Sequence, residues 1–310
     1  MTQQRVIGVD LGGTKILAGI VDRSGVVERR RESPTPIESQ DELLQGLEAA
    51  VAEVLDDGVV AIGLGIPSTI DQRTGRAVSS VNIPLADLDV RAWVGERFGL
   101  PVGIDNDANA ATLAEWAFGA GKGVRYMVML TLGTGVGGGL ILDGRPYRGA
   151  IGAGAELGHM VIDLDGPPCQ GACTGRGHLE ALASGHAATM AAREVFGPAV
   201  DAHRLVRLAD EGDQTAIELL ATLGHRLGAG IGSLVNIFNP ELVVIGGGFS
   251  AAGDFLLEPA REMVARESLA PGRDLVRIVR AELGTAAGLV GAGLVAFEAL
   301  DGAGTGTGTA

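Results

Sequence analysis

A strand, a glycine–threonine turn and a second strand follow one another twice in this chain, and this repeat most constrains its fold. The first copy is RVIGVDLGGTKILAGIV (5–21), and the second is RYMVMLTLGTGVGGGLILDG (125–144). The apolar runs on either side of each turn have the length and composition of buried strands. Because a repeated supersecondary unit indicates a repeated half of a fold, we predict two similar halves that face a cleft.

The rest of the sequence alternates strands and helices, which indicates an α/β fold. Ser39 and Glu42 have the spacing of a capping box and mark the start of the first helix. Besides the second hairpin, the predicted strands are 5–11, 15–21, 26–32, 59–66, 101–107, 241–248 and 276–284. The predicted helices are 39–57, 89–99, 107–119, 178–196, 215–238, 254–267 and 286–299.

The same pattern indicates two domains and a tail. We place a smaller α/β domain at 1–118 and a larger one at 119–286. The last helix, at about 287–300, is expected to pack back on the smaller domain. The final segment DGAGTGTGTA (301–310) has low complexity and is predicted to be a disordered tail.

Composition argues against several classes of function. The formal net charge is −14 and no basic stripe is visible, so we expect no nucleic-acid partner. We find no N-terminal apolar run typical of a signal peptide and no stretch of about 18 apolar residues typical of a membrane span. Two cysteines are too few for a disulfide framework. We therefore expect a cytoplasmic protein with no membrane partner, whose acidity serves solubility.

Neither glycine-rich hairpin turn fits the two best-known nucleotide-binding loops. GVDLGGTK (8–15) nearly matches a P-loop, but Thr14 precedes Lys15, and the residues that follow are strand-like rather than helical. GTGVGG (133–138) matches G-x-G-x-x-G, but a strand and a turn follow it, where a dinucleotide-binding fold requires the N-terminus of a helix.

Strand-to-strand turns of small residues instead suit a phosphate chain, because their N–H groups and hydroxyls can approach phosphate oxygens closely. With one such turn in each half, we predict a phosphate chain gripped between the domains. A third turn, in VVIGGGFS (243–250), is well placed for a nucleotide's sugar and base. The turns supply Asp10, Gly12, Gly13, Thr14 and Lys15, then Thr131, Gly133, Thr134 and Gly135, and finally Gly247 and Gly248.

The motifs, in their order, resemble those of the ROK family of sugar kinases and repressors. They span nearly the whole chain and are DLGGTK, DNDAN, TLGTGVGGG, ELGH, a cysteine-rich loop ending in HLEALASG, and VVIGGG. Within that family the chain is most similar to bacterial ATP-dependent glucokinases. The resemblance implies an actin-like ATPase fold, with two ribonuclease-H-like domains around a cleft. Because the first strand begins at Arg5, the helix-turn-helix module of the repressor members is not expected.

The resemblance also implies that Asp107, in IDNDAN (104–109), is the general base that accepts the proton of a sugar hydroxyl. A carboxylate that ends a strand and starts a helix would point into the cleft. Asp105 is the competing choice, and the alternative role for Asp107 is to cap the helix. Asp10 is expected to orient the metal-bound water or the phosphates.

Family position further implies a set of residues that contact the sugar. Glu156 and His159 are three residues apart, so a helical or tight-turn conformation would place both on one side. Asn82, in VNIP, is expected to contribute from the first domain. The full set is Asn82, Asn106, Asp107, Glu156, His159 and Glu180.

The family pattern has a histidine and C-x-C-x4-C, four ligands of a structural zinc. This chain has C-x3-C-x4-H instead, and the implied ligands are His159, Cys169, Cys173 and His178. Two cysteines and two histidines suit tetrahedral zinc. A cytosolic disulfide and a metal-free loop are the alternatives. A zinc here would be structural and would brace the loop that carries the sugar-contacting residues.

The resemblance implies a glucokinase that uses ATP and Mg²⁺. Its reaction would transfer the γ-phosphoryl group to the 6-hydroxyl of glucose, giving glucose 6-phosphate and ADP. The alternatives are a kinase for N-acetylmannosamine, fructose or allose, a polyphosphate-using enzyme, which the net charge disfavours, and a non-enzymatic sugar sensor. A homodimer is the family expectation, with a tetramer as the alternative.

Overall fold

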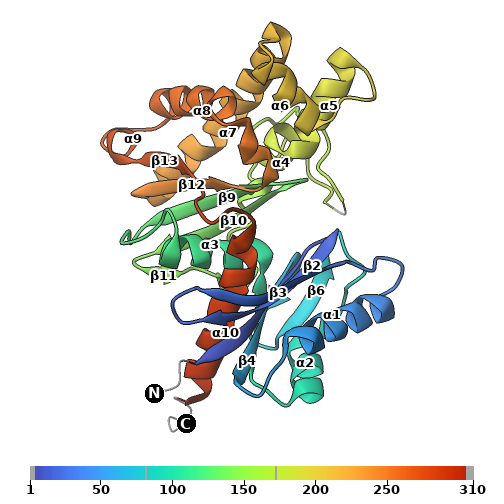
Figure 1. The fold of residues 1–310 in the computed structure, drawn as a ribbon. Helices are drawn as coiled ribbons and strands as arrows, with labels where there is room; N and C mark the ends of the chain where they lie inside the picture. Colours follow the sequence, from blue (N-terminus) through green and yellow to red (C-terminus); the bar gives the residue numbers. More distant parts are fainter. Residues whose placement is uncertain (1–3, 81, 172, 305–310) are drawn as a thin grey trace. The chain divides into compact units, whose positions relative to one another are not determined.

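A computed structural model of the chain describes residues 4–80, 82–171 and 173–304. The chain divides into two compact units, each a sheet with helices packed on it (Figure 1). Unit 1 comprises Met1–Lys122, Pro146–Gly154 and Thr285–Ala310, and unit 2 comprises Gly123–Arg145 and Ala155–Gly284.

This division differs from the expected one in three respects. The segment Pro146–Gly154 belongs to unit 1, although it was assigned to the larger domain. The two units are nearly equal in length rather than one small and one large. The first four residues of the predicted tail, 301–304, are helical, because they continue the last helix, and the remainder of that tail lies outside the described residues.

The unit 1 sheet has the strand order β3-β2-β1-β4-β8. Strand β2 runs antiparallel to both β3 and β1, whereas β1, β4 and β8 run parallel. All five strands were predicted, and β1, β2, β4 and β8 have the apolar runs typical of buried strands. Their bounds are β1 Arg5–Leu11, β2 Lys15–Asp22, β3 Val27–Pro34, β4 Val59–Ile66 and β8 Val102–Asn106.

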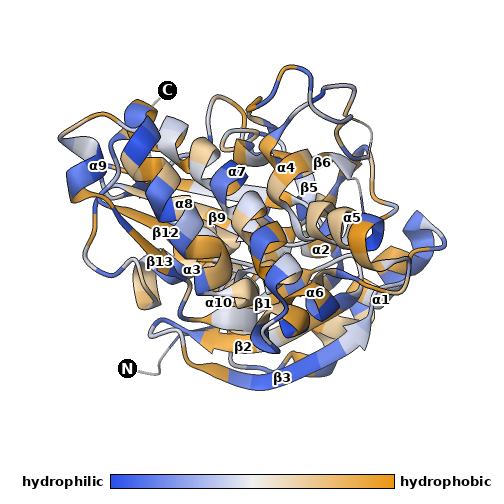
Figure 2. Ribbon diagram, turned by 90° about the horizontal axis from the view of Figure 1, so that it is seen from above, coloured by the Kyte–Doolittle hydropathy of each residue, from blue (hydrophilic) through white to orange (hydrophobic). Residues whose placement is uncertain are grey.

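The edge strand β3 is protected by charge. Its sequence is VERRRESP, most of its side chains are exposed, and it is coloured as hydrophilic over most of its length in Figure 2. Its charges are paired: Glu32 lies 2.9 Å from Lys15, and Arg31 lies 3.0 Å from Glu53. A charged edge disfavours the addition of a strand from another molecule.

A row of four glycines crosses the unit 1 sheet, and the last helix, α10 (Ala287–Gly304), packs directly on it. A Cβ atom on Gly63 would overlap the carbonyl oxygen of Ala292 in that helix, and Cβ atoms on Gly8 and Gly103 would overlap its backbone in the same way, whereas one on Gly19 would meet the Leu289 side chain at 3.2 Å. The absence of side chains therefore lets helix and sheet backbones touch. This glycine row consists of register partners on β2, β1, β4 and β8: Gly19, Gly8, Gly63 and Gly103.

Successive side chains of each strand point to opposite faces of this sheet, and helices cover both faces. Val6 belongs to the apolar cluster beside α10, whereas Ile7 belongs to the cluster beside helices α1 and α2. The N-terminus of α1 is as predicted, since the Ser39 hydroxyl accepts a hydrogen bond from the Glu42 N–H at 3.2 Å. The helix bounds are α1 Gln40–Val54, α2 Val90–Phe98 and α3 Asp107–Phe118.

A small antiparallel sheet, β5-β6-β7, was not predicted. Its strands are β5 Ser68–Asp71, β6 Arg76–Ser80 and β7 Leu88–Asp89, which are too short to give a clear pattern. The Gln72 side chain ties this region to the main sheet by donating to the Ile104 carbonyl at 2.8 Å.

The unit 2 sheet has the order β11-β10-β9-β12-β13 and repeats the topology of unit 1. Its hairpin β9–β10 is antiparallel, and β12 and β13 follow in parallel on the other side of β9. The prediction of two similar halves is therefore confirmed. The strand bounds are β9 Met127–Leu132, β10 Val136–Leu142, β11 Arg145–Pro146, β12 Leu242–Gly246 and β13 Arg277–Arg280.

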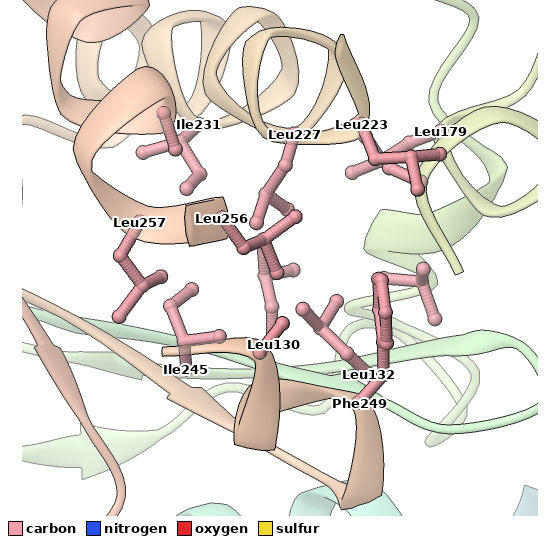
Figure 3. Packing of buried hydrophobic residues seen from close by; sticks show 14 of the residues in the cluster. Leu130, Leu132, Leu179, Leu223, Leu227, Ile231, Ile245, Phe249, Leu256 and Leu257 are labelled. Carbon is pink, nitrogen blue, oxygen red and sulfur yellow. The ribbon is translucent and has the colours of Figure 1, made fainter. Parts of the chain in front are cut away.

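Helices α7 and α8 pack together above this sheet. Figure 3 shows Leu227 of α7 and Leu256 of α8 directed towards Leu130 and Ile245 of the strands. The α-helices of unit 2 are α4 Leu179–Ala183, α5 Gly185–Phe196, α6 Ala202–Asp210, α7 Gln214–Phe238, α8 Asp254–Glu267 and α9 Gly272–Leu275. Short 3₁₀ turns lie at η1 Leu157–His159, η2 Gly248–Ala252 and, at the junction with unit 1, η3 Gly284–Ala286.

Two helix predictions in unit 2 were wrong. The expected helix at 178–196 is broken at Ser184, which ends α4 and whose hydroxyl caps α5 by accepting from the Ala187 N–H at 3.1 Å. Helix α6 was missed, although the Asp201 carboxylate caps it by accepting from the Arg204 N–H at 2.8 Å. Serine and aspartate are preferred N-caps, so both signals were present in the sequence.

Among the described residues, α10 is the one helix whose length and apolar composition alone would suit a membrane span. Half of its apolar window is buried inside the fold. Leu289 and Phe297 pack in the cluster on the unit 1 sheet, so the apolar surface of α10 serves as core.

The glycine row gives a stability prediction. We expect Gly63→Ala to lower the free energy of unfolding by about 3 kcal/mol, because the new methyl group overlaps the backbone of α10. Gly302→Ala, in the same helix with open space around the new atom, should be neutral or slightly stabilising. Urea denaturation measures both, and equal stabilities of the two variants would contradict the close packing of α10.

Candidate active site

The β1–β2 turn in unit 1 is held rigidly by backbone hydrogen bonds. The Gly12 N–H donates to the Lys15 carbonyl at 2.9 Å, and the Thr35 hydroxyl donates to the Gly12 carbonyl at 2.7 Å. Gly13 adjoins Asn82, because a Cβ on Gly13 would lie 3.2 Å from the Asn82 Cβ. The structure thus brings Asn82 to the predicted phosphate turn.

The Lys15 ammonium forms an ion pair across the strands with Glu32 of β3, at 2.9 Å. Both side chains are close to half exposed, so the pair contributes little to stability. The charge of Lys15 nevertheless reaches Asp10, where it partly opposes the rise in pKa that burial causes.

Asp10 lies buried at the end of β1. Its pKa is raised from 3.8 to about 6, first by burial and then by the nearby Asp107 carboxylate, against the opposing effect of Lys15. A Cβ on Gly288 would overlap the Asp10 carboxyl group, so this group lies against the first turn of α10. The N-terminal end of a helix favours negative charge, which makes this place suitable for an ionised carboxylate or another anionic group.

The junction of β8 and α3 is capped by Asn106 rather than by Asp107 alone. The Asn106 Oδ1 accepts from the N–H groups of Ala108 and Asn109 at 2.9 and 3.2 Å. Asp107 is the first helical residue and also accepts from the Ala108 N–H, at 2.9 Å. Since Asn106 fills the capping role, capping is not sufficient to explain the acidic residue at position 107.

Asp105, the competing choice for the base, is fully buried and occupied on both oxygens. Its Oδ1 accepts from the Asn106 N–H at 2.8 Å and from the Asn109 side chain at 3.1 Å. Its Oδ2 lies 2.5 Å from Nε of Arg148, whose Nη2 in turn lies 2.7 Å from Glu298 of α10. A carboxylate paired in this way fixes structure and is poorly placed to exchange protons.

Arg148 is a residue of this site that the sequence did not reveal. Burial alone would lower its pKa, but the carboxylates of Asp105 and Glu298 reverse the effect and raise it. Arg148 is separated in sequence from Asp105 by 43 positions and from Glu298 by 150 positions, so no local sequence pattern predicts this pairing.

In unit 2 the β9–β10 turn is closed by the Gly133 N–H, which donates to the Gly135 carbonyl at 2.9 Å. The Glu180 carboxylate accepts from the Val136 N–H at 2.9 Å, and a Cβ on Gly135 would overlap it. Gly247, with φ of 81°, approaches the backbone of Leu132. The second and third predicted turns therefore meet, while Thr131 lies within β9 and pairs with Gly137 and Gly246.

A cavity of about 550 Å³ opens beside these turns, wholly within unit 2. Three predicted residues line it: Gly133, Thr134 and Gly248. Its remaining wall comes from the start of α5, from α6 and from η2, and includes His186, Thr189, Asp201, His203, Val206, Arg207 and Phe249. This wall was missed because α6 was missed.

The predicted metal ligands converge in unit 2. One donor atom from each of His159, Cys169, Cys173 and His178 lies within 4.8 Å of every other. Each sulfur lies 3.6 Å from an imidazole Nδ1, Cys169 from His159 and Cys173 from His178. Two thiols and two imidazoles at this spacing fit a tetrahedral metal such as zinc.

The predicted sugar contacts of unit 2 gather beside this cluster. The 3₁₀ turn η1 places Glu156 and His159 together, with the His159 N–H donating to the Glu156 carbonyl at 3.1 Å. Burial raises the pKa of Glu156, His159 opposes this effect, and the Glu180 carboxylate adds to it. Glu180 also contacts the cluster, with its Oε1 3.7 Å from the Cys169 sulfur.

Comparisons with known proteins find relatives along nearly the whole chain. A glucokinase of Thermotoga maritima is 34% identical over 97% of this chain and 100% of its own length. The crystal structure of a ROK family glucokinase from Streptomyces griseus in complex with glucose and AMPPNP has a TM-score of 0.84 at 34% identity, covering 95% of this chain and 99% of that one. A ROK hexokinase from Thermus thermophilus has a TM-score of 0.80 at 39% identity, covering 96% and 99%.

These similarities extend over nearly the whole chain, and the family model described as ROK family matches residues 6–299. The topology of two similar sheets, the two glycine–threonine turns and the Cys/His cluster all lie within that range. This chain belongs to the ROK family.

Proposed function

We propose that this protein is an ATP-dependent glucokinase that transfers the γ-phosphoryl group to the 6-hydroxyl of glucose, giving glucose 6-phosphate and ADP. The observation that carries the proposal is the β8–α3 junction, where Asp105 is locked by Arg148 and Asn106 fills the cap. Of the three residues at this junction, Asp107 is the remaining candidate for the general base. The glucokinases and the hexokinase to which the chain is similar support the same reaction.

Asp107 would accept the proton of the 6-hydroxyl as that oxygen attacks the phosphoryl group. The Asn106 cap and the buried Asp105 hold the start of α3, so the Asp107 carboxylate is oriented before substrate arrives. Asn82, Asn106, Glu156, His159 and Glu180 are proposed to hold the hydroxyls of the sugar.

The nucleotide is proposed to lie with its phosphates at the two glycine turns and its adenosine in the unit 2 cavity beside α6. Backbone N–H groups of such turns suit phosphate oxygens. Asp10 is proposed to orient the Mg²⁺ that accompanies ATP, and a bound cation would favour the ionised form of this carboxyl group.

The Cys/His cluster is proposed to hold a structural zinc, which supplies a fixed tetrahedral anchor for its loop. The Nδ1 atom of His159 faces the cluster. Its Nε2 is on the opposite side of the ring and is proposed to reach the sugar. A homodimer stays a prediction of the family resemblance.

A coupled assay with ATP, Mg²⁺ and a panel of sugars tests the proposed reaction. We expect glucose to be phosphorylated with the highest kcat/KM, and N-acetylmannosamine, fructose and allose to be poorer substrates. Replacement of ATP by polyphosphate should give little turnover, because the acidic chain offers a long anion no basic track. Turnover of another hexose without turnover of glucose would contradict the proposal.

The assignment of the base predicts a selective loss of turnover. Asp107→Asn should lower kcat about 10²–10⁴-fold, with an unchanged melting temperature, because it removes only the proton acceptor. Asp105→Asn is the comparison and should lower the melting temperature, because it leaves Arg148 buried beside a neutral partner. An Asp107→Asn enzyme that keeps about a tenth of the wild-type kcat would reassign the base.

The metal proposal predicts about one zinc per chain in purified protein, measured by plasma mass spectrometry. Cys173→Ala should lose the metal, because three ligands remain. His178→Cys is a matched control that restores the family ligand, and it should retain the metal. Active wild-type protein that contains no zinc would contradict the site.

A further inference from the structure

The loop that carries the Cys/His cluster has little regular structure of its own. Among its described residues, Val161 pairs with His178 and Pro168 with Arg176 in isolated bridges, and the turns between them are held by backbone hydrogen bonds such as that from the Cys169 N–H to the Gly175 carbonyl at 2.9 Å. Because the four clustered ligands come from separate points along this segment, a metal bound by them would tie the loop together. A side chain that reaches from this loop to another part of unit 2 is therefore positioned by the cluster.

Gln170 is such a side chain. It follows Cys169 directly and lies in the part of the loop where the cysteine spacing is longer than in the family pattern. Its Nε2 lies 3.3 Å from the Thr134 carbonyl oxygen and 3.3 Å from the Ser184 hydroxyl. One amide group thus donates both to the β9–β10 turn and to the cap of α5.

Both acceptors shape the wall of the unit 2 cavity. Ser184 caps α5, and the first residues of that helix bond to the turn: the Gly185 N–H donates to the Gly133 carbonyl at 2.8 Å, and the His186 N–H to the Thr134 carbonyl at 3.4 Å. These four bonded residues, Gly133, Thr134, Gly185 and His186, all line the cavity.

A second link runs from the same end of the loop to the same turn. Glu180 contacts the Cys169 sulfur through Oε1 at 3.7 Å and accepts from the Val136 N–H through Oε2 at 2.9 Å. Glu180 is already proposed to contact the sugar, whereas Gln170 has no other assigned role. Gln170 is therefore the residue that can report on the coupling alone.

We propose that Gln170 is a positioning residue that couples metal occupancy of the Cys/His cluster to the shape of the phosphate-binding turn. The metal fixes the loop, the loop fixes the Gln170 amide, and the amide holds the Thr134 carbonyl and the α5 cap in the geometry that binds nucleotide. This inference rests on the proposed function, because it takes the cavity to be the nucleotide site.

Gln170→Ala removes both hydrogen bonds and leaves the four ligands intact. We expect the dissociation constant for Mg²⁺–AMPPNP, measured by calorimetry without sugar, to rise about threefold to tenfold. Zinc content and glucose affinity should equal those of the wild type. Gln170→Glu should weaken nucleotide binding further, because a carboxylate not only fails to donate to the Thr134 carbonyl but also repels its oxygen. Thr174→Ala, at an exposed position of the same loop, is the control and should bind as the wild type does.

Removal of the metal by a chelator provides a second test of the coupling. The wild type should lose nucleotide affinity, and Gln170→Ala should lose less, because the route from metal to turn is already broken. If circular dichroism shows that the chelated chain unfolds, the comparison of metal-loaded variants decides alone.

The outcomes separate this inference from the proposed function. Wild-type protein that binds no Mg²⁺–AMPPNP would overturn both. Wild-type protein that binds nucleotide, with Gln170→Ala within twofold of it, would overturn the coupling and leave the proposed function standing. Equal losses on metal removal in folded wild-type and Gln170→Ala protein would also overturn it, because the metal would then act by another route.

Discussion

The backbone contact between α10 and the glycine row is the constraint on which unit 1 depends. It requires three register-paired positions without side chains, Gly8, Gly63 and Gly103, and it fixes the helix at one height above the sheet. Three contacts of α10 with the rest of unit 1 depend on this position above the sheet. Gly288 of α10 lies against Asp10, Gly291 lies against the Ala110 carbonyl of α3, and Glu298 pairs with Arg148 behind Asp105. One helix thereby locates the end of β1, the start of α3 and the end of β8.

Unit 2 has the same sheet topology but orders its site through polar contacts instead. Its β9–β10 turn is held by the Glu180 carboxylate of α4, by the start of α5 and by the Gln170 amide of the loop that carries the Cys/His cluster. A metal bound by that cluster is proposed to tie the loop together, because its described residues form isolated bridges rather than strands. The two halves thus share a fold and differ in what makes their turns rigid.

Features with a local cause could be predicted from the sequence. Buried strands such as β1 and β4 are continuous apolar runs, and the two hairpins need glycine at their turns, so both were found. The Cys/His ligands depended on the family resemblance, because a C-x3-C spacing alone is also compatible with a disulfide. Features with a distant cause were missed: Arg148 meets Asp105 only in the folded chain, and the glycine row is visible only once register is known. The break at Ser184 was missed because an apolar period continues through it.

Asp107 is proposed to perform the chemistry, whereas Asp105 is proposed only to support it. A crystal structure with glucose and AMPPNP bound would distinguish these two roles. We expect an Asp107 carboxylate oxygen about 2.6–3.2 Å from the 6-hydroxyl of glucose, with Asp105 still paired with Arg148. A 6-hydroxyl bonded to Asp105, or an Asp107 carboxylate turned away from the sugar, would contradict it.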